Sequence, residues 1–149
     1  MTVRAAFVTP LGRLVVGETA GVITSLHWSE EVASDDSPLL RQALAQLTAY
    51  FAGKLQAFDL PLDWGEGLNA RVRRAMAAIP YGQTRTYGEI SRDVGAPAQA
   101  VGQACGANPV PVFIPCHRVL GAAGLGGFSA RGGVETKAAL LRHEGALLL

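Results

Sequence analysis

Short apolar runs rich in β-branched residues fill the first part of the chain and predict strands at 3–8, 14–17 and 22–28. Proline and glycine in the segment 9–12 indicate a turn between the first two runs. The segment 19–21, Thr-Ala-Gly, is typical of a hairpin between the second run and the third. The N-terminal part of the chain is therefore expected to form a small sheet.

One helix is predicted after this sheet, beyond an acidic linker. Ser37 can accept a hydrogen bond as its N-cap, and Pro38 suits the first helical position. Leucines and Phe51 then recur at helical spacing as far as Gly53, a residue type that commonly ends helices. A further short strand is predicted at 57–62.

The rest of the chain has mainly helical patterning, with helices predicted at 68–79, 87–94, 98–107 and 136–143. Thr86 can cap the second of these, and the Gly-Ala-Pro turn at 95–97 separates the second from the third. Two short helices around such a turn form the helix-turn-helix pattern. We place a domain boundary in the loop at 64–67. The expected fold is α/β (α+β), with a small sheet-plus-helix domain (1–65) followed by a mainly helical domain (66–149).

The predicted helix at 98–107 has an almost bare surface. Its residues are mostly small, namely Ala98, Ala100, Gly102, Ala104, Gly106 and Ala107. Glycine within a helix costs up to about 1 kcal/mol relative to alanine, so this composition indicates that something approaches the backbone closely. A packed neighbouring helix and a DNA groove explain it equally well.

Charge distribution narrows the function classes. The net charge is only +1, yet residues 1–65 carry four basic and seven acidic side chains, whereas residues 66–149 carry nine basic and five acidic. A surface that faces nucleic-acid phosphates is therefore expected in the second half, although arginines scattered for solubility give the same count. No apolar run approaches the length of a membrane span, and the first residues lack the apolar segment of a secretory signal.

The two cysteines of the chain, Cys105 and Cys116, offer no disulfide framework and form no Cys-x-x-Cys pair. Residues 1–65 contain His27 but no other histidine and no cysteine that could bind a metal ion with it. We therefore expect no metal, no cofactor and no membrane association. The expected setting is reducing and cytoplasmic, where a free reactive thiol survives.

Cys116 and His117 stand at the end of an apolar run, 108–115, that has strand character. A nucleophilic cysteine acts as the thiolate, and a neighbouring imidazole is the usual means of forming it near neutral pH. Adjacent residues of an extended strand point to opposite sides, so these two side chains can cooperate only through a turn or a bridging water. The alternative is that Cys116 is a small buried hydrophobic residue.

The pentapeptide at 115–119, Pro-Cys-His-Arg-Val, follows Asn108-Pro109 and the apolar run, and it resembles the active-site signature of O6-alkylguanine-DNA alkyltransferases. Proteins of that family transfer an alkyl group from damaged DNA to their own cysteine. The resemblance spans 68–145, with further matching segments at 79–82, 86–90, 100–102, Lys137, Leu141 and 144–145. Within residues 1–65 the resemblance is one of layout.

This resemblance implies a ribonuclease-H-like N-terminal domain with a scaffolding role and a winged helix-turn-helix-like C-terminal domain. It also implies that Cys116 is the alkyl acceptor, that His117 deprotonates it through a water, and that Glu144 orients the imidazole. Asn108 would brace the turn that leads to the cysteine, and Tyr87 would contact the flipped guanine. Each molecule would act once, because no residue is evidently able to remove the alkyl group from the thioether.

The same resemblance implies a partner, double-stranded DNA that contains O6-alkylguanine, bound through the minor groove with the damaged base flipped out. It implies no obligate protein partner. The residues expected to contact DNA are Thr86, Gln99, Ala100, Gly102 and Arg118. The residues expected in the substrate pocket are Val119, Phe128 and Ser129.

The chain departs from the family pattern at Gln99, where an arginine usually fills the gap left by the extruded base. Glutamine is uncharged, so we expect weaker duplex binding. Two other function classes stay open: a non-enzymatic alkyltransferase-like protein that marks lesions, and a Cys-His hydrolase. Alkyltransferase-like proteins generally lack the cysteine and keep the arginine, and this chain has the reverse. A hydrolase needs an oxyanion hole, and no segment predicts one.

Overall fold

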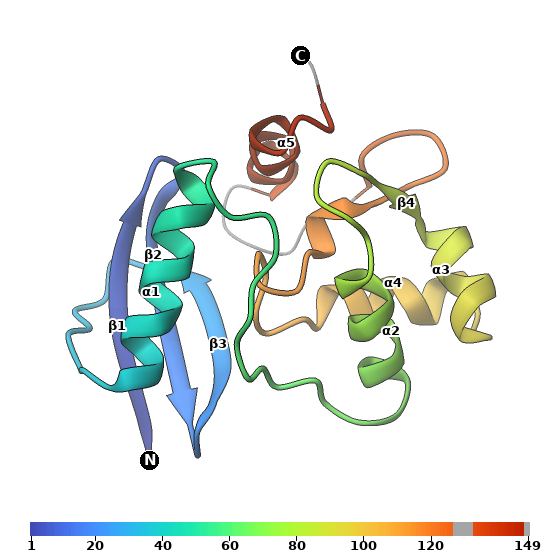
Figure 1. Cartoon of the computed structure of the whole chain (residues 1–149). Helices are drawn as coiled ribbons and strands as arrows, with labels where there is room; N and C mark the ends of the chain where they lie inside the picture. The colour runs from blue at the N-terminus through green and yellow to red at the C-terminus, as the bar shows by residue number, and fades with distance from the viewer. Residues whose placement is uncertain (127–132, 148–149) are drawn as a thin grey trace. The chain divides into compact units, whose positions relative to one another are not determined.

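The computed structural model describes residues 1–126 and 133–147 of the 149-residue chain. The chain forms two compact units, residues 1–63 and 64–149. Among the described residues, the first unit holds a three-stranded sheet and one α-helix, and the second holds four α-helices and one pair of short parallel strands (Figure 1). This arrangement confirms the predicted α/β (α+β) class.

The sheet of the first unit is a meander of three antiparallel strands, β1 (Thr2–Thr9), β2 (Gly12–Thr19) and β3 (Val22–Trp28), in the order β1-β2-β3. The two residues between β2 and β3, Ala20 and Gly21, have positive φ angles of 52° and 81°. Positive φ at both positions is the requirement of the two-residue hairpin turn that matches the twist of the strands. The predicted strands and hairpin are therefore confirmed.

Helix α1 (Pro38–Phe51) lies across one face of this sheet (Figure 1). Its start is as predicted, because the Ser37 hydroxyl accepts a hydrogen bond from the Leu40 amide at 3.0 Å. Leu40, Leu47 and Tyr50 are buried and form the apolar face of the helix. Burying side chains of this size stabilises a fold by about 1.5–3 kcal/mol each, which is enough to hold one helix on a small sheet.

The predicted strand at 57–62 is wrong. Only Leu62 makes a bridge, to Ile23 of β3, and the residues before it form bends and irregular chain. Pro61 interrupts the segment and has no backbone N–H with which to extend a ladder.

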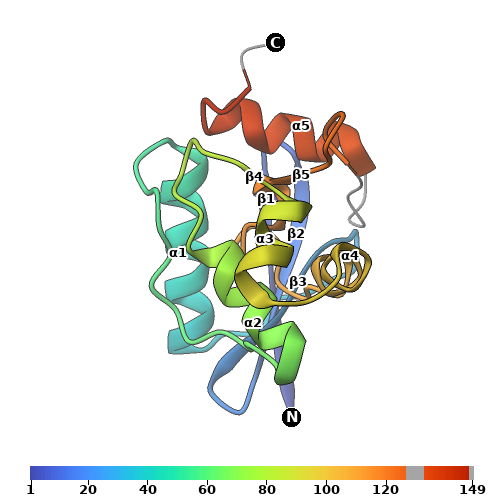
Figure 2. The same cartoon turned by 90° about the vertical axis from the view of Figure 1, so that its right-hand side faces the viewer.

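The second unit is built from α2 (Gly67–Ala77), α3 (Tyr87–Val94), α4 (Ala98–Gly106) and α5 (Gly133–His143), with strands β4 (Arg85–Thr86) and β5 (Val119–Leu120) paired in parallel. Helices α2, α3 and α4 pack on one another, as Figure 2 shows. The Thr86 side chain caps α3 and forms a reciprocal capping box with Glu89. Gly95 ends that helix with a left-handed φ of 70°. The predicted helix-turn-helix is thus confirmed.

The apolar run that leads to the cysteine is not a strand, which corrects the sequence-based prediction. Residues 109–115 form turns, with a single bridge between Pro111 and Ile114 and a φ of 74° at Val112. Three prolines in this run lack the N–H groups that a ladder needs. Residues Cys116–Arg118 then form a single 3-10 turn, η1.

Within residues 1–126 and 133–147, no helix is both long enough and apolar enough to cross a membrane.

Candidate active site

The turn η1 gives Cys116 and His117 different environments. The Cys116 amide donates to the Ile114 carbonyl at 2.8 Å, and the Arg118 amide donates to the Pro115 carbonyl at 3.0 Å. Cys116 is partly accessible, whereas His117 and Arg118 are buried. The turn that the sequence required for cooperation between thiol and imidazole is therefore present.

Asn108 lies where α4 joins the turns before the cysteine. Its amide nitrogen donates to the Ile114 carbonyl at 2.9 Å, and its amide oxygen accepts from the Val110 backbone at 3.1 Å. Ile114 is the residue whose carbonyl also receives the Cys116 amide. One side chain thus connects the end of α4 with the backbone that carries Cys116.

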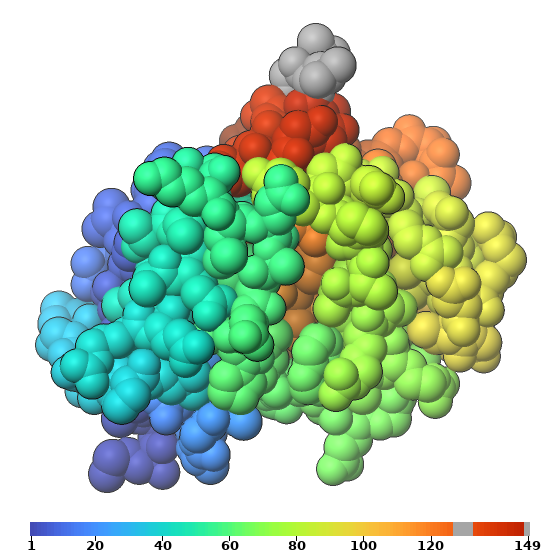
Figure 3. All heavy atoms as spheres, viewed as in Figure 1, coloured from blue at the N-terminus to red at the C-terminus, as the bar shows by residue number. Residues whose placement is uncertain are grey.

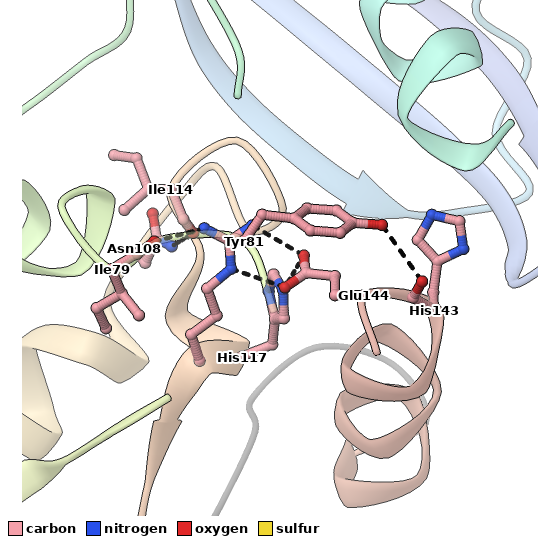
Figure 4. A network of polar contacts seen from close by, with 8 residues as sticks. Ile79, Tyr81, Asn108, Ile114, His117, His143 and Glu144 are labelled. Carbon is pink, nitrogen blue, oxygen red and sulfur yellow. Dashed lines mark hydrogen bonds and ion pairs between the residues drawn. The ribbon is translucent and has the colours of Figure 1, made fainter. Parts of the chain in front are cut away.

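His117 and Glu144 form a buried pair that joins η1 to the residue after α5. The imidazole Nε2 lies 2.8 Å from a carboxylate oxygen of Glu144, and neither side chain is exposed (Figure 4). Burial lowers the pKa of His117, and the hydrogen bond and charge of Glu144 act in the opposite direction. The imidazole is consequently neutral near pH 7 and free to take a proton.

The tautomer of His117 follows from the state of Glu144. Both Glu144 oxygens receive hydrogen bonds from Arg118, at 2.8 and 3.0 Å, so the carboxylate is ionised and can only accept. Nε2 of His117 must then carry the proton of the His–Glu hydrogen bond. Nδ1 is buried and accepts no hydrogen bond from the described residues. Its lone pair is therefore the basic site of the imidazole.

Arg118 points into the protein, whereas the sequence placed it among the residues expected to contact DNA. Its side chain is only 7 % exposed, it binds Glu144 through two nitrogens, and its third nitrogen donates to the Ile79 carbonyl at 2.7 Å. All three nitrogens of this guanidinium are bonded inside the protein, and its burial keeps it away from solvent, where a phosphate would bind. Arg118 instead holds Glu144 in place behind His117.

Burial raises the pKa of Cys116, whereas the hydrogen bond from Asn108 and the charge of Lys137 lower it. Because the pKa of the thiol is raised, Cys116 needs a base to form the thiolate near neutral pH. His117, the next residue, carries a basic nitrogen that could serve. Cys105 lies on the buried side of α4, and burial raises its pKa to about 12, so that it stays protonated.

Lys137 is a site residue to which sequence reasoning assigned no role. It lies on α5 with no exposed surface, and its ammonium donates to the Val119 carbonyl at 2.6 Å. The same ammonium lies 5.7 Å from the centre of the Tyr87 ring. Lysine on the same helical face as Leu140 and Leu141, three and four residues further on, was the signal that could have identified it.

Tyr87 is the first residue of α3 and is partly buried. Burial raises the pKa of its hydroxyl, and the nearby Cys105 and Cys116 act in the same direction. A Cβ atom at Gly126 would lie 3.0 Å from the ring, so the glycine allows the backbone to approach Tyr87 closely. The structure therefore brings Tyr87, Cys116 and Lys137 into one neighbourhood.

The remaining expected residues are divided between the surface and the interior. Gln99 is exposed, Ala100 and Gly102 are partly exposed, and the Thr86 hydroxyl is used in capping α3. The turn between α3 and α4 lies on the surface of the second unit (yellow in Figure 3). Val119 is buried, and its amide donates to the Cys116 carbonyl. Phe128 and Ser129 lie outside the described residues.

Helix α4 has room for a side chain at Gly102 and at Gly106, whereas Ala104 of the same helix is buried. A Cβ atom added at Gly102 or Gly106 would meet nothing within 4 Å. Of the two explanations for the small residues, a packed neighbouring helix is therefore excluded for these two glycines within the described residues, and a partner outside the protein is favoured.

Gly102→Ala is expected to stabilise the fold and weaken DNA binding. Alanine is better than glycine inside a helix by about 0.5–1 kcal/mol, and the added methyl group occupies the approach to the helix. Urea unfolding and fluorescence anisotropy with a short duplex measure the two effects. A gain in stability together with a loss of DNA affinity excludes damage to the fold as the cause of the weaker binding. Unchanged DNA affinity would show that DNA does not approach α4 at this position.

Among the described residues, no group of three or more His, Cys, Asp or Glu side chains could hold a metal ion. The chemistry described above uses the thiol, the imidazole and the carboxylate.

Comparisons with known proteins cover both units. Residues 67–146 match the sequence model of the 6-O-methylguanine DNA methyltransferase DNA-binding domain, and residues 3–64 match that of the ribonuclease-like domain of the same family. The methylated-DNA--protein-cysteine methyltransferase of Mycobacterium tuberculosis is 43% identical over 147 residues, covering 91% of this chain and 88% of its own. The constitutive enzyme of the same name from Bacillus subtilis is 40% identical over 151 residues, covering 91% of each chain.

Solved structures give the same result. The crystal structure of the M. tuberculosis O6-methylguanine methyltransferase superposes with a TM-score of 0.86 at 41% identity and covers 98% of this chain and 94% of that one. The M. tuberculosis protein in complex with DNA has a TM-score of 0.83 at 42% identity, with coverage of 95% and 91%. Both family models together with relatives of this identity and coverage show that the chain belongs to the 6-O-methylguanine DNA methyltransferase family.

Proposed function

We propose that this protein repairs DNA by moving the alkyl group of O6-alkylguanine to Cys116, once per molecule. The observation that carries the proposal is the buried chain Arg118–Glu144–His117, which leaves Nδ1 as the basic nitrogen of the imidazole, in the residue that directly follows the partly accessible Cys116. Relatives at about 40% identity carry the name of this activity. Residues 66–149 bind DNA and accept the alkyl group, and residues 1–65 serve as the scaffold.

The reaction begins with removal of the Cys116 proton by Nδ1 of His117 through one bridging water, a geometry that general bases use. Glu144 stabilises the imidazolium that results. The thiolate attacks the alkyl carbon, so that the S–C bond forms as the O6–C bond breaks and its electron pair passes to guanine. Guanine takes up the proton that the thiol lost. The products are a thioether and normal guanine, with atoms and charge balanced.

DNA binds through the helix-turn-helix formed by α3 and α4. The exposed, small-residue surface of α4 around Gly102 suits the narrow minor groove, where side-chain readout of bases is limited. The reacting carbon lies inside the duplex, so the nucleotide must be flipped towards Cys116 at a cost of a few kcal/mol. Tyr87 contacts the flipped base, and Val119, Phe128 and Ser129 complete its pocket.

Two free thiols and a reaction that requires one of them in the reduced state suit a reducing compartment. We place the reaction in the cytoplasm.

Incubation with a duplex that contains O6-methylguanine, followed by intact-mass and peptide-mass analysis, tests the proposed function. The expected result is one added methyl group per protein, on Cys116. Binding without transfer would favour the alkyltransferase-like reading. Release of acid from an ester substrate, without transfer from DNA, would favour the hydrolase.

Gln99→Arg is expected to tighten duplex binding by about fivefold, equivalent to about 1 kcal/mol for one added cation. The residue is exposed at the start of α4, so a guanidinium there can neutralise a phosphate or fill the gap left by the flipped base. Repair of methylated duplex is expected to accelerate, with a smaller gain on single-stranded substrate, where no gap exists.

The ratio of the duplex gain to the single-strand gain separates the two effects, since an added charge alone helps both substrates. Binding measured over a range of salt concentrations should show a slope steeper by about one unit. Equal gains on both substrates would contradict the role of Gln99 as a weak plug.

A further inference from the structure

Lys137 is a fully buried cation that the mechanism above does not use. Its ammonium reaches the Val119 carbonyl at 2.6 Å, and the Tyr87 ring centre lies 5.7 Å away. Moving an ammonium from water into the protein interior is unfavourable before its interactions are counted. Such a group persists where the site has a use for a positive charge.

Three elements meet at this ammonium. Val119 follows η1 directly and begins β5, Tyr87 begins α3, and Lys137 itself lies on α5. The ammonium therefore holds Val119, the first residue after η1, and it also lies near the ring of Tyr87. Its position depends on α5, which ends one residue before Glu144, the other charged group that α5 supplies to the site.

Hydrogen bonds connect Lys137 to the turn that carries Cys116, because the Val119 carbonyl accepts from the ammonium while the Val119 amide donates to the Cys116 carbonyl. Among the described residues, the groups that act on the pKa of Cys116 or are acted on by it are the Asn108 amide, the Tyr87 hydroxyl, the Cys105 thiol, the backbone amides of Cys116 and His117, and the Lys137 ammonium. Lys137 is the cation of this set, while the Arg118 guanidinium binds Glu144 on the far side of the imidazole. Lys137 lowers the pKa of Cys116, and Cys116 in turn raises the pKa of Lys137 against the effect of burial.

We propose that Lys137 is a positioning residue for alkyl transfer, whose buried ammonium stabilises the thiolate of Cys116 while it holds the Val119 carbonyl in place. This inference rests on the proposed function in taking Cys116 as the acceptor. Two residues of α5 and its C-terminal end then have separate tasks. Glu144 stabilises the protonated imidazole of His117, and Lys137 stabilises the thiolate of Cys116. Transfer of an alkyl group cancels the thiolate charge, so the electrostatic partner of the ammonium is lost in the product.

The test measures the reactivity of the Cys116 thiol towards iodoacetamide as a function of pH, without DNA, in the full chain. Chymotryptic cleavage after Phe113 places Cys105 and Cys116 on different peptides, so their modification is read separately by mass spectrometry. Lys137→Met removes the charge and keeps the length, whereas Lys137→Arg keeps the charge.

The methionine variant is expected to react at least about tenfold more slowly at pH 7, because a neighbouring opposite charge commonly changes the ionisation of a group by an order of magnitude or more. Its pH profile moves to higher pH, and the arginine variant restores most of the reactivity. Coincident profiles for the wild type and the methionine variant would overturn the proposal. An arginine variant as slow as the methionine variant, with its fold intact, would overturn it as well.

Urea unfolding checks that the variants fold, which is expected for methionine since an apolar side chain of similar volume replaces a desolvated ion. If that variant does not fold, NMR titration of the Lys137 side chain in the wild type decides. The ammonium should lose its proton at lower pH once Cys116 carries an uncharged carbamidomethyl group, and an unchanged titration would overturn the proposal.

Failure of this inference is distinguishable from failure of the proposed function. Iodoacetamide reports on the thiol alone, whereas transfer from methylated DNA reports on the repair reaction. Methyl transfer that survives Cys116→Ala would remove the proposed function and leave the measured coupling between Lys137 and Cys116 intact.

Discussion

Cys116→Ala is expected to abolish alkyl transfer from O6-methylguanine in DNA while the fold and most of the DNA affinity are retained. Cys116 directly precedes His117, whose Nδ1 is the proposed base, and alanine removes the proposed nucleophile without adding volume. Cys116 is partly accessible, so the loss of its sulfur costs little packing. Intact mass after incubation with methylated duplex measures transfer, and anisotropy measures binding.

Cys105→Ala is the matched control, because Cys105 is the other thiol of the chain. Burial raises its pKa to about 12, which disfavours the thiolate near neutral pH. Transfer is expected to be nearly unchanged in this variant. Transfer that persists in Cys116→Ala and disappears in Cys105→Ala would move the acceptor to Cys105.

Glu144→Gln is expected to affect both catalysis and stability. The structure shows the carboxylate bound to His117 and to Arg118 at once. Loss of its charge leaves the buried guanidinium without its counter-ion, and breaking a buried ion pair in this way typically costs about 3–5 kcal/mol. The sequence assigned Glu144 only the orientation of the imidazole, since it placed Arg118 among the DNA contacts.

The catalytic effect has a definite sign. Glu144 raises the pKa of His117 against the lowering by burial, so the variant has a lower pKa at His117 and a weaker base. Transfer is expected to slow by about 100-fold, the lower range for general base catalysis. The pH–rate profile moves to higher pH, because the thiol must then ionise without help and burial raises its pKa.

Glu135→Gln is the control, since Glu135 is an exposed glutamate in the first turn of α5, the helix that directly precedes Glu144. It should change neither the urea midpoint nor the pH–rate profile. Single-turnover transfer across a pH series and urea unfolding provide the two measurements for Glu144→Gln. A stable variant with the wild-type pH profile would contradict both roles of Glu144.

The sequence alone determined the features that depend on neighbours a few residues apart. The cap at Ser37, the hairpin turn at Ala20 and Gly21, and the capping box of Thr86 are local hydrogen-bond and backbone effects. Helix positions followed for the same reason. The juxtaposition of Cys116 and His117 was likewise readable, because the two residues are adjacent in the chain.

The local hydrophobic pattern did not predict the conformation of the segment before Cys116, because prolines and a hydrogen-bonding partner determine it. The run before Cys116 is apolar enough for a strand, but its prolines cannot donate to a ladder, so it folds into turns that Asn108 holds. That error was avoidable from the sequence, since each proline marks a missing donor.

Only the tertiary structure decided the directions of the charged side chains. Arg118 turns inward because Glu144, 26 residues away in the chain, and the Ile79 carbonyl, 39 residues away, bind its guanidinium. Lys137 is buried because Val119 and Tyr87 receive its ammonium. Charge composition predicts a solvated surface for such residues, and a buried ion pair depends on groups that meet only when the chain folds.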